Sequence, residues 1–316
     1  RARLPTELDE SLEEFVVRFF IGIGIPSTIV STLTFYLLAR KNVVSAVDVR
    51  ILMMLVQVSM FLYNFHFCIL FVPFIYPFTG GGFCKGVLCS LGVRFHYQMC
   101  FWLFTIIFIC SSFIALLFAR YQAFLHPWSK LKLRMVWKLV FYIITYSSMS
   151  VIPVLFLFTD TAQDVQEQKV EVTYQLDWVI DNKVFSIVDG QGKFVLAQTI
   201  KYIMIGNIAV FGSFTVVMFV LILLKIFRAK IYQMSNQAQA KYRAKIKNSI
   251  VILSQMFLAV CLGIVPLCVM VAAVGSADHR EQGVGVESEK IVLICEMVTT
   301  TVSLINSAIF ILGNKQ

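Results

Sequence analysis

Charge is scarce in this chain of 316 residues, because Asp, Glu, Lys and Arg make up only 14% of it while apolar residues make up 59%. The sequence also lacks an HExxH, a GxSxG and a Walker motif, and it has no cysteine and histidine cluster with metal-ligand spacing. A nucleic-acid-binding protein needs basic residues on a shared water-facing surface, and this composition leaves little such surface. We therefore expect no enzymatic activity, no cofactor, no metal and no nucleic-acid partner.

Long apolar stretches are present instead, seven of them, each with at least 22 residues. A helix of about 20 apolar residues crosses the ~30 Å hydrocarbon core of a bilayer. The pattern predicts an all-α membrane protein, a seven-transmembrane-helix bundle that forms a single domain over residues 1–316. The predicted spans are Phe15–Leu38, Ile51–Phe78, Phe95–Phe118, Val136–Phe158, Phe194–Leu224, Asn248–Val274 and Ile291–Leu312.

The connections between the spans alternate in charge. Residues 39–50, 119–138, 225–247 and 313–316 hold 16 Lys or Arg and a single acid, Asp48. Residues 1–14, 79–94, 159–193 and 275–290 hold nine Lys or Arg and 16 acids. Short connections rich in Lys and Arg stay in the cytoplasm, so we expect the N-terminus outside and the C-terminus inside. The basic segment 225–247 is explained by this topology and by contact with anionic lipid, and it also suits a protein partner.

The longest outer connection shows a strand-like pattern. Residues Val170–Leu176 alternate apolar and polar side chains, and Val184–Val188 follow a turn-prone link. Alternation on both sides of a turn favours a β-hairpin in this second extracellular loop, over the mouth of the bundle. A disordered acidic loop is the alternative.

Two of the eight cysteines, Cys84 and Cys89, lie in or next to the first outer loop. Disulfides persist in an extracellular setting. A bond between these two cysteines, or from one of them to Cys68 or Cys295 near the outer ends of their helices, is compatible with the sequence. The spacing does not choose among these pairings.

Three charged residues lie about one to two turns below the outer ends of spans, namely Arg18, Lys201 and Glu296. In one interpretation Arg18 and Lys201 extend to the interface and Arg18 pairs with Glu296. In the other, Lys201 and Glu296 line an outward-facing cavity together with His96 and Gln98. Aromatic and apolar side chains with a few polar groups form the common ligand pocket, so this second interpretation predicts a small-molecule site.

Two short motifs lie where helices reach the cytoplasm. Arg120-Tyr121 ends the third span and Asn306–Phe310 ends the seventh, while Pro266 interrupts the sixth. Interaction of arginine with a helix C-terminus and interface anchoring by tyrosine would explain the first motif alone. Proline removes a backbone hydrogen bond, so we expect a kink at Pro266.

Taken together, these motifs resemble a known family. The segment Ala119–Pro127 resembles the Asp-Arg-Tyr…His-Pro segment of rhodopsin-like G-protein-coupled receptors, and Asn306–Phe310 resembles their Asn-Pro-x-x-Tyr motif. The departures are Ala119 in place of the acid, Cys261–Pro266 in place of Cys-Trp-x-Pro, no Asp in span two, no proline in span five, and no cysteine after span four for the usual bridge. With the Phe-rich spans, they make the chain similar to nematode serpentine chemoreceptors of the Str superfamily, nearest to class H or class I.

The resemblance implies a chemosensory receptor in the plasma membrane of sensory cilia. Its partners would be membrane lipid, a small-molecule odorant or pheromone, and a heterotrimeric G protein. Arg120 and Tyr121 would meet the C-terminal helix of Gα, and Asn306 and Phe310 would rearrange on activation about Pro266. With Ala119 in place of the acid, either another group restrains Arg120, or basal activity is high, or coupling differs.

A second hypothesis comes from another functional class. The same departures suit a heptahelical subunit of a homo-oligomeric channel or scaffold without G-protein coupling. A symmetric ring of particles in detergent would favour the channel, and a monomer or dimer the receptor. A transporter ranks third, because internal repeats or paired broken helices are absent from the sequence.

Overall fold

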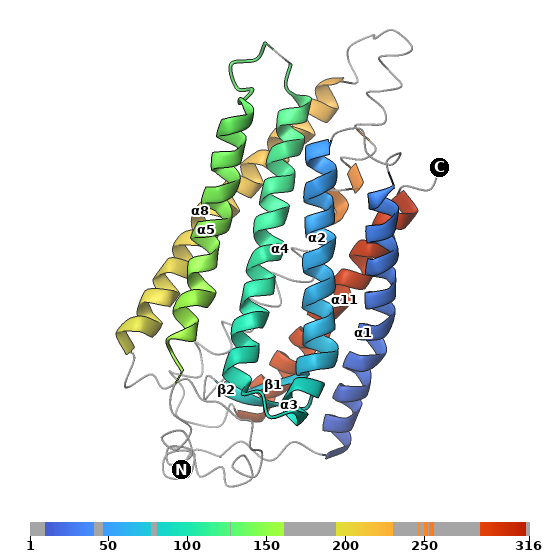
Figure 1. Ribbon diagram of the computed structural model, residues 1–316, viewed down its shortest axis with the longest axis vertical. Helices are drawn as coiled ribbons and strands as arrows, with labels where there is room; N and C mark the ends of the chain where they lie inside the picture. Colours follow the sequence, from blue (N-terminus) through green and yellow to red (C-terminus); the bar gives the residue numbers. More distant parts are fainter. Residues whose placement is uncertain are drawn as a thin grey trace.

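The computed structural model describes residues 10–40, 47–76, 81–126, 128–160, 194–229 and 285–313, with isolated positions at 246, 250, 251 and 253–255. Within these ranges, six helices are long and apolar enough to cross a membrane. They lie side by side as one bundle (Figure 1). Most of the predicted sixth span, 248–274, and the β-hairpin predicted within 159–193 lie outside the described residues.

The bundle consists of α1 (Glu10–Ala39), α2 (Val47–Phe65), α4 (Phe95–Phe124), α5 (Met135–Leu157), α8 (Phe194–Ala229) and α11 (Gly285–Gly313). Helix α1 packs on α2 and α11, α2 packs on α4, and α4 packs on α5 and α8. Each helix corresponds to a predicted span, but α4 extends six residues beyond the predicted end at Phe118. Good helix formers such as Arg120 and Gln122 allow that extension. Because a proline disfavours the helical conformation of the residue before it, Pro127 favours the end of the helix ahead of His126.

The second span departs from the prediction of a helix to Phe78. Helix α2 ends at Phe65 and continues as one π-helical segment, η1 (His66–Phe71). Val72 then takes a left-handed conformation with φ of 43°, and β1 (Pro73–Tyr76) follows as a strand. Pro73 has no backbone N–H to continue a helix, while the apolar residues after it suit a strand as well as a membrane helix. The predicted span was therefore too long.

A β-hairpin is present in the first outer loop. Strand β1 pairs antiparallel with β2 (Gly81–Cys84), and Phe74 stands opposite Phe83. The rings of these two phenylalanines stack with centroids 4.9 Å apart. A side chain at Gly82 would collide with the carbonyl oxygen of Phe74, so only glycine allows the strands to approach there.

A disulfide closes the turn after this hairpin. Cys84 is bonded to Cys89, which lies in the short helix α3 (Val87–Ser90). Cys68 and Cys295, the other candidate partners, are free and buried. The hairpin and α3 lie at the end of the bundle where α1 and α11 begin (Figure 1), which is the predicted outer end.

Candidate functional site

An aromatic cluster fills the outer half of the bundle between three helices. Phe67 is central to it: its ring lies 5.5 Å from that of Phe20, 5.6 Å from that of Tyr63 and 5.7 Å from that of Trp102, measured between centroids. These four side chains come from α1, α2, η1 and α4, and all are buried. We call Phe20, Tyr63, Phe67 and Trp102 the outer aromatic cluster.

Glu296 of α11 belongs to the same region. Leu293, one turn before it, belongs to the same buried apolar core as the outer aromatic cluster, and Met297, next to it, packs against this core. Glu296 is only 2% exposed and lies within electrostatic range of Tyr63. Neither carboxyl oxygen has a hydrogen-bond partner among the described residues. A carboxyl group in such a place is costly unless something pairs with it.

The predicted pair between Arg18 and Glu296 does not form. Arg18 Nη2 instead lies 2.9 Å from Glu14 Oε2, one helical turn earlier on α1. Both side chains are mostly exposed, at 80% and 62%. Arg18 therefore reaches water with a local partner, as its long flexible side chain permits, and Glu296 is left without it.

His96 and Gln98, two predicted ligand contacts, are buried on different sides of α4. The imidazole of His96 stacks on Phe156 of α5, with centroids 4.9 Å apart. Gln98 Nε2 donates to the carbonyl oxygen of Val93 at 2.9 Å and lies 3.0 Å from Cys89 Sγ. Residues two positions apart on a helix point in nearly opposite directions. No hydrogen bond or ion pair joins either side chain to Glu296 in the described part of the chain.

The fourth predicted ligand contact, Lys201, lies in α8. The structure describes the backbone of Lys201 but not its side chain. The four predicted positions are thus distributed over α4, α8 and α11, and of the three whose side chains are described, Glu296 is the one that adjoins the outer aromatic cluster.

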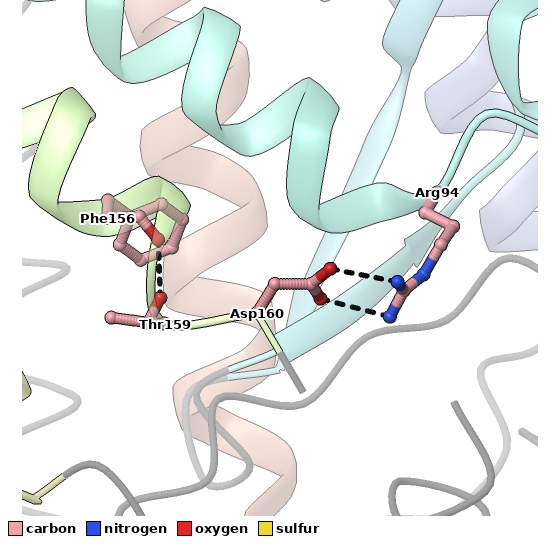
Figure 2. Close-up of polar contacts among 4 residues, drawn as sticks. All are labelled: Arg94, Phe156, Thr159 and Asp160. Carbon is pink, nitrogen blue, oxygen red and sulfur yellow. Dashed lines mark hydrogen bonds and ion pairs between the residues drawn. The ribbon is translucent and has the colours of Figure 1, made fainter. Parts of the chain in front are cut away.

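Two ion pairs join the outer ends of the elements. Arg94, at the start of α4, makes a two-pronged contact with Asp160 just after α5, with N–O distances of 2.9 and 3.0 Å (Figure 2). Thr159, next to Asp160, donates its hydroxyl to the carbonyl oxygen of Phe156 at 2.7 Å (Figure 2). Lys85, after β2, pairs with Glu13 of α1. These contacts tie the third and fourth spans together at their outer ends, and the hairpin to the first.

A chain of buried polar contacts runs between α1, α2 and α11 below the outer aromatic cluster. Asn64 donates to the hydroxyl of Ser27. The hydroxyls of Ser31 and Ser307 lie 3.3 Å apart, and Ser307 donates to Gln57 Oε1 at 3.2 Å. All five are buried. Sequence reasoning missed them, although Ser27 and Ser31 stand four residues apart, the spacing of one helix face.

Asn306, from the motif at the end of the seventh span, extends these contacts inward. Its side-chain Nδ2 lies 3.3 Å from Met60 Sδ, and its backbone carbonyl oxygen accepts a hydrogen bond of 3.0 Å from Gln255 Nε2. Phe310 is 1% exposed and lies in the inner apolar core. Thus Asn306 connects α11 both with α2 and with a described residue of the predicted sixth span. Pro266 lies outside the described residues.

Arg120 lies inside the bundle at the inner end of α4. It is only 5% exposed, and Ala119 and Tyr121 beside it are 6% exposed. Arg120 Nη2 lies 3.9 Å from the sulfur of Met53 on α2. No acid pairs with Arg120 in the part of the chain that the structure describes. With Ala119 in place of the acid, the described neighbour of the Arg120 guanidinium is the thioether of Met53 rather than a carboxylate.

Comparison with known proteins identifies a family and a fold. The model of a family described as the serpentine type 7TM GPCR chemoreceptor Srh matches residues 11–312. The crystal structure of squid rhodopsin is similar in fold, with a TM-score of 0.54 over 96% of this chain and 83% of that chain. At 8% identity, this second likeness shows the fold alone. None of the curated proteins matches.

Proposed function

The chain belongs to the Srh family of serpentine seven-transmembrane chemoreceptors, and from that premise we propose that it binds a small molecule on its extracellular side and signals to a heterotrimeric G protein. It would do so as an integral protein of the plasma membrane of sensory cilia. The single observation that carries the coupling proposal is the burial of Arg120, which is 5% exposed at the inner end of the bundle.

A buried arginine without a carboxylate partner favours a conformational change that exposes it. Placing its charge in an apolar core is costly, so a state that brings Arg120 to water or to a partner's acceptor groups gains free energy at that position. The described arrangement then corresponds to a resting state. Arg120 and Tyr121 would meet the Gα C-terminal helix only after neighbouring elements move apart.

The polar contacts supply a route for such a movement. Glu296 and Asn306 lie on the same helix, α11, and Asn306 contacts both Met60 and Gln255. A ligand that shifts α11 would therefore change contacts of the second and sixth spans near the inner end. The ligand acts only if it binds the active arrangement better than the resting one. We assign the ligand site to Glu296, the predicted contact that adjoins the outer aromatic cluster, and the switch to Arg120, Tyr121, Pro266, Asn306 and Phe310.

The first prediction concerns Arg120 itself. In membranes that contain the receptor and a Gα panel, a panel of volatile odorants is screened for stimulated nucleotide exchange. We expect Arg120→Ala to reduce the stimulated rate by at least about tenfold, a loss of about 1.4 kcal/mol of coupling free energy.

Lys130→Ala provides the matched control, because Lys130 is a basic residue of the inner loop that follows α4 and is exposed. It should leave the exchange rate within about twofold of the unmodified receptor, as expected for a screened surface charge. Equal rates for Arg120→Ala and the unmodified receptor, with equal surface expression, would contradict the proposed coupling.

A further inference from the structure

Glu296 is a buried carboxyl group that the fold itself does not use. Both of its oxygens are without a hydrogen-bond partner among the described residues, although the side chain is 2% exposed. Arg18, which one interpretation of the sequence paired with it, pairs with Glu14 instead. Polar groups buried in membrane bundles are costly, and those retained usually face a substrate or an ion. A ligand that enters from the extracellular side would supply the missing partner for this carboxyl group.

The surroundings of Glu296 suit a cation. Tyr63, Phe67 and Trp102 present aromatic rings in one contiguous cluster. The faces of such rings attract ammonium groups, most strongly when water is excluded. The hydroxyl of Tyr63 and Nε1 of Trp102 interact with each other and are buried without a further partner among the described residues. The site therefore combines aromatic rings with a carboxyl group whose two oxygens have no partner among the described residues.

Other ligand classes fit these groups less well. An anion would be repelled by a carboxylate and would meet no described cation there. A divalent metal ion prefers several oxygen, nitrogen or sulfur ligands, and no group of three or more His, Cys, Asp or Glu comes together among the described residues. A neutral odorant would bury apolar surface against the rings but would leave the carboxyl group unpaired.

We propose that Glu296, Tyr63 and Trp102 form the recognition site for the ammonium group of a small organic cation. The inference rests on the proposed function, since it names the chemical class of the extracellular ligand. Glu296 lies five residues below Ile291, where the apolar part of α11 begins, which corresponds to a depth of about 8 Å. The carboxylate pairs with the ammonium group, and the side chains of Tyr63 and Trp102, both stacked on Phe67, form the neighbouring aromatic wall.

The test compares charged probes with neutral molecules of the same shape on the full chain, purified into lipid nanodiscs. Choline is paired with 3,3-dimethylbutanol, and phenethylamine with 2-phenylethanol. We expect at least one cation to raise the Tm of the receptor while its neutral counterpart, at the same concentration, does not. Glu296→Gln should weaken binding of that cation by at least about tenfold, and Trp102→Phe by severalfold.

Glu14→Gln is the matched control, since it removes an acid from the outer end of α1 that is 62% exposed, and it should keep the affinity of the unmodified receptor. All variants are compared at equal monodispersity, and Trp102→Phe supplies a second test should Glu296→Gln fail to fold. The proposal is overturned if no cation raises the Tm, if the neutral counterparts bind equally well, or if Glu296→Gln retains full affinity.

A nucleotide-exchange assay separates this inference from the proposed function. Exchange stimulated by neutral odorants alone, and unchanged in Glu296→Gln, would overturn the ammonium site but leave the receptor function intact. Binding of a cation that requires Glu296, without exchange on any Gα, would support the ammonium site and contradict G-protein coupling.

Discussion

At the scale of single residues, Arg120 and Glu296 share one property. Each is a charge-bearing side chain that is at most 5% exposed and has no ion-pair partner among the described residues. They lie at opposite ends of the bundle, Arg120 at the inner end of α4 and Glu296 near the outer end of α11. Since an unpaired buried charge opposes stability, such positions indicate functional rather than structural selection of the residue type.

A prediction at this scale concerns Ala119. An aspartate there would stand beside Arg120, where an ion pair would stabilise the buried arrangement. We expect Ala119→Asp to lower basal nucleotide exchange by up to about tenfold, equivalent to about 1.4 kcal/mol in favour of the resting state. Ala119→Asn, which has a similar shape without the charge, serves as the control and should change the basal rate much less. A basal rate that rises in Ala119→Asp would argue against restraint by pairing at this position.

At the scale of elements, an ion pair rather than a disulfide links α4 to the segment after α5 at the outer end of the bundle. The bridge from span three to the loop after span four cannot form, because residues 159–193 contain no cysteine. The structure has the ion pair between Arg94 and Asp160 at that place (Figure 2). It also has a disulfide, Cys84–Cys89, but this bond closes a turn within the first outer loop. A polar link between α4 and the end of α5 therefore stands where a covalent one is usual.

The prediction at this scale is a double-mutant cycle on Arg94 and Asp160. Their side chains are 25% and 19% exposed, and the contact is two-pronged, so we expect a coupling free energy of about 1 kcal/mol. Thermal unfolding in detergent of Arg94→Ala, Asp160→Ala and the double variant gives this value.

The pair Arg18–Glu14 offers a matched control, because it also joins an arginine to an acid but is largely exposed. Its coupling should be near zero to about 0.5 kcal/mol. If the two cycles give the same coupling, the pair between Arg94 and Asp160 does not act as a link between α4 and α5.

At the scale of the whole molecule, the fold is that of a rhodopsin-like bundle and the protein is integral to the membrane. Large apolar side chains are exposed along α5 and α8, among them Ile143, Val151, Ile208 and Val216. Such surface is stable against lipid tails rather than water. The interior carries the polar contacts, so the molecule is organised for a bilayer, with lipid-facing apolar surfaces and a partly polar core.

The prediction for the whole molecule tests its orientation in intact cells. A membrane-impermeant maleimide should label Glu14→Cys, at the outer end of α1, because acidic connections are predicted to be outside. Lys130→Cys, in the basic loop between α4 and α5, should react only after the cells are permeabilised. The unmodified receptor gives the background from its native cysteines. Labelling of Lys130→Cys in intact cells would reverse the predicted topology.

The sequence by itself determined the membrane bundle, six spans that the described residues show, and the family. These follow from long apolar runs and from short motifs such as Arg120-Tyr121, which are local in the chain. It did not determine where the second span ends, because Pro73–Tyr76 is apolar enough for a helix or a strand and only pairing with Gly81–Cys84 decides.

Tertiary structure also decided the partners of individual polar groups. Arg18 and Glu296 are both near the outer ends of their helices, but helix packing turns Arg18 to water and Glu296 to the outer aromatic cluster. His96 and Gln98 are two residues apart, yet one contacts α5 and the other the disulfide. Contacts between distant segments depend on how helices rotate against one another, which a single sequence does not encode locally. That rotation is why Glu296, rather than His96 or Gln98, adjoins the outer aromatic cluster.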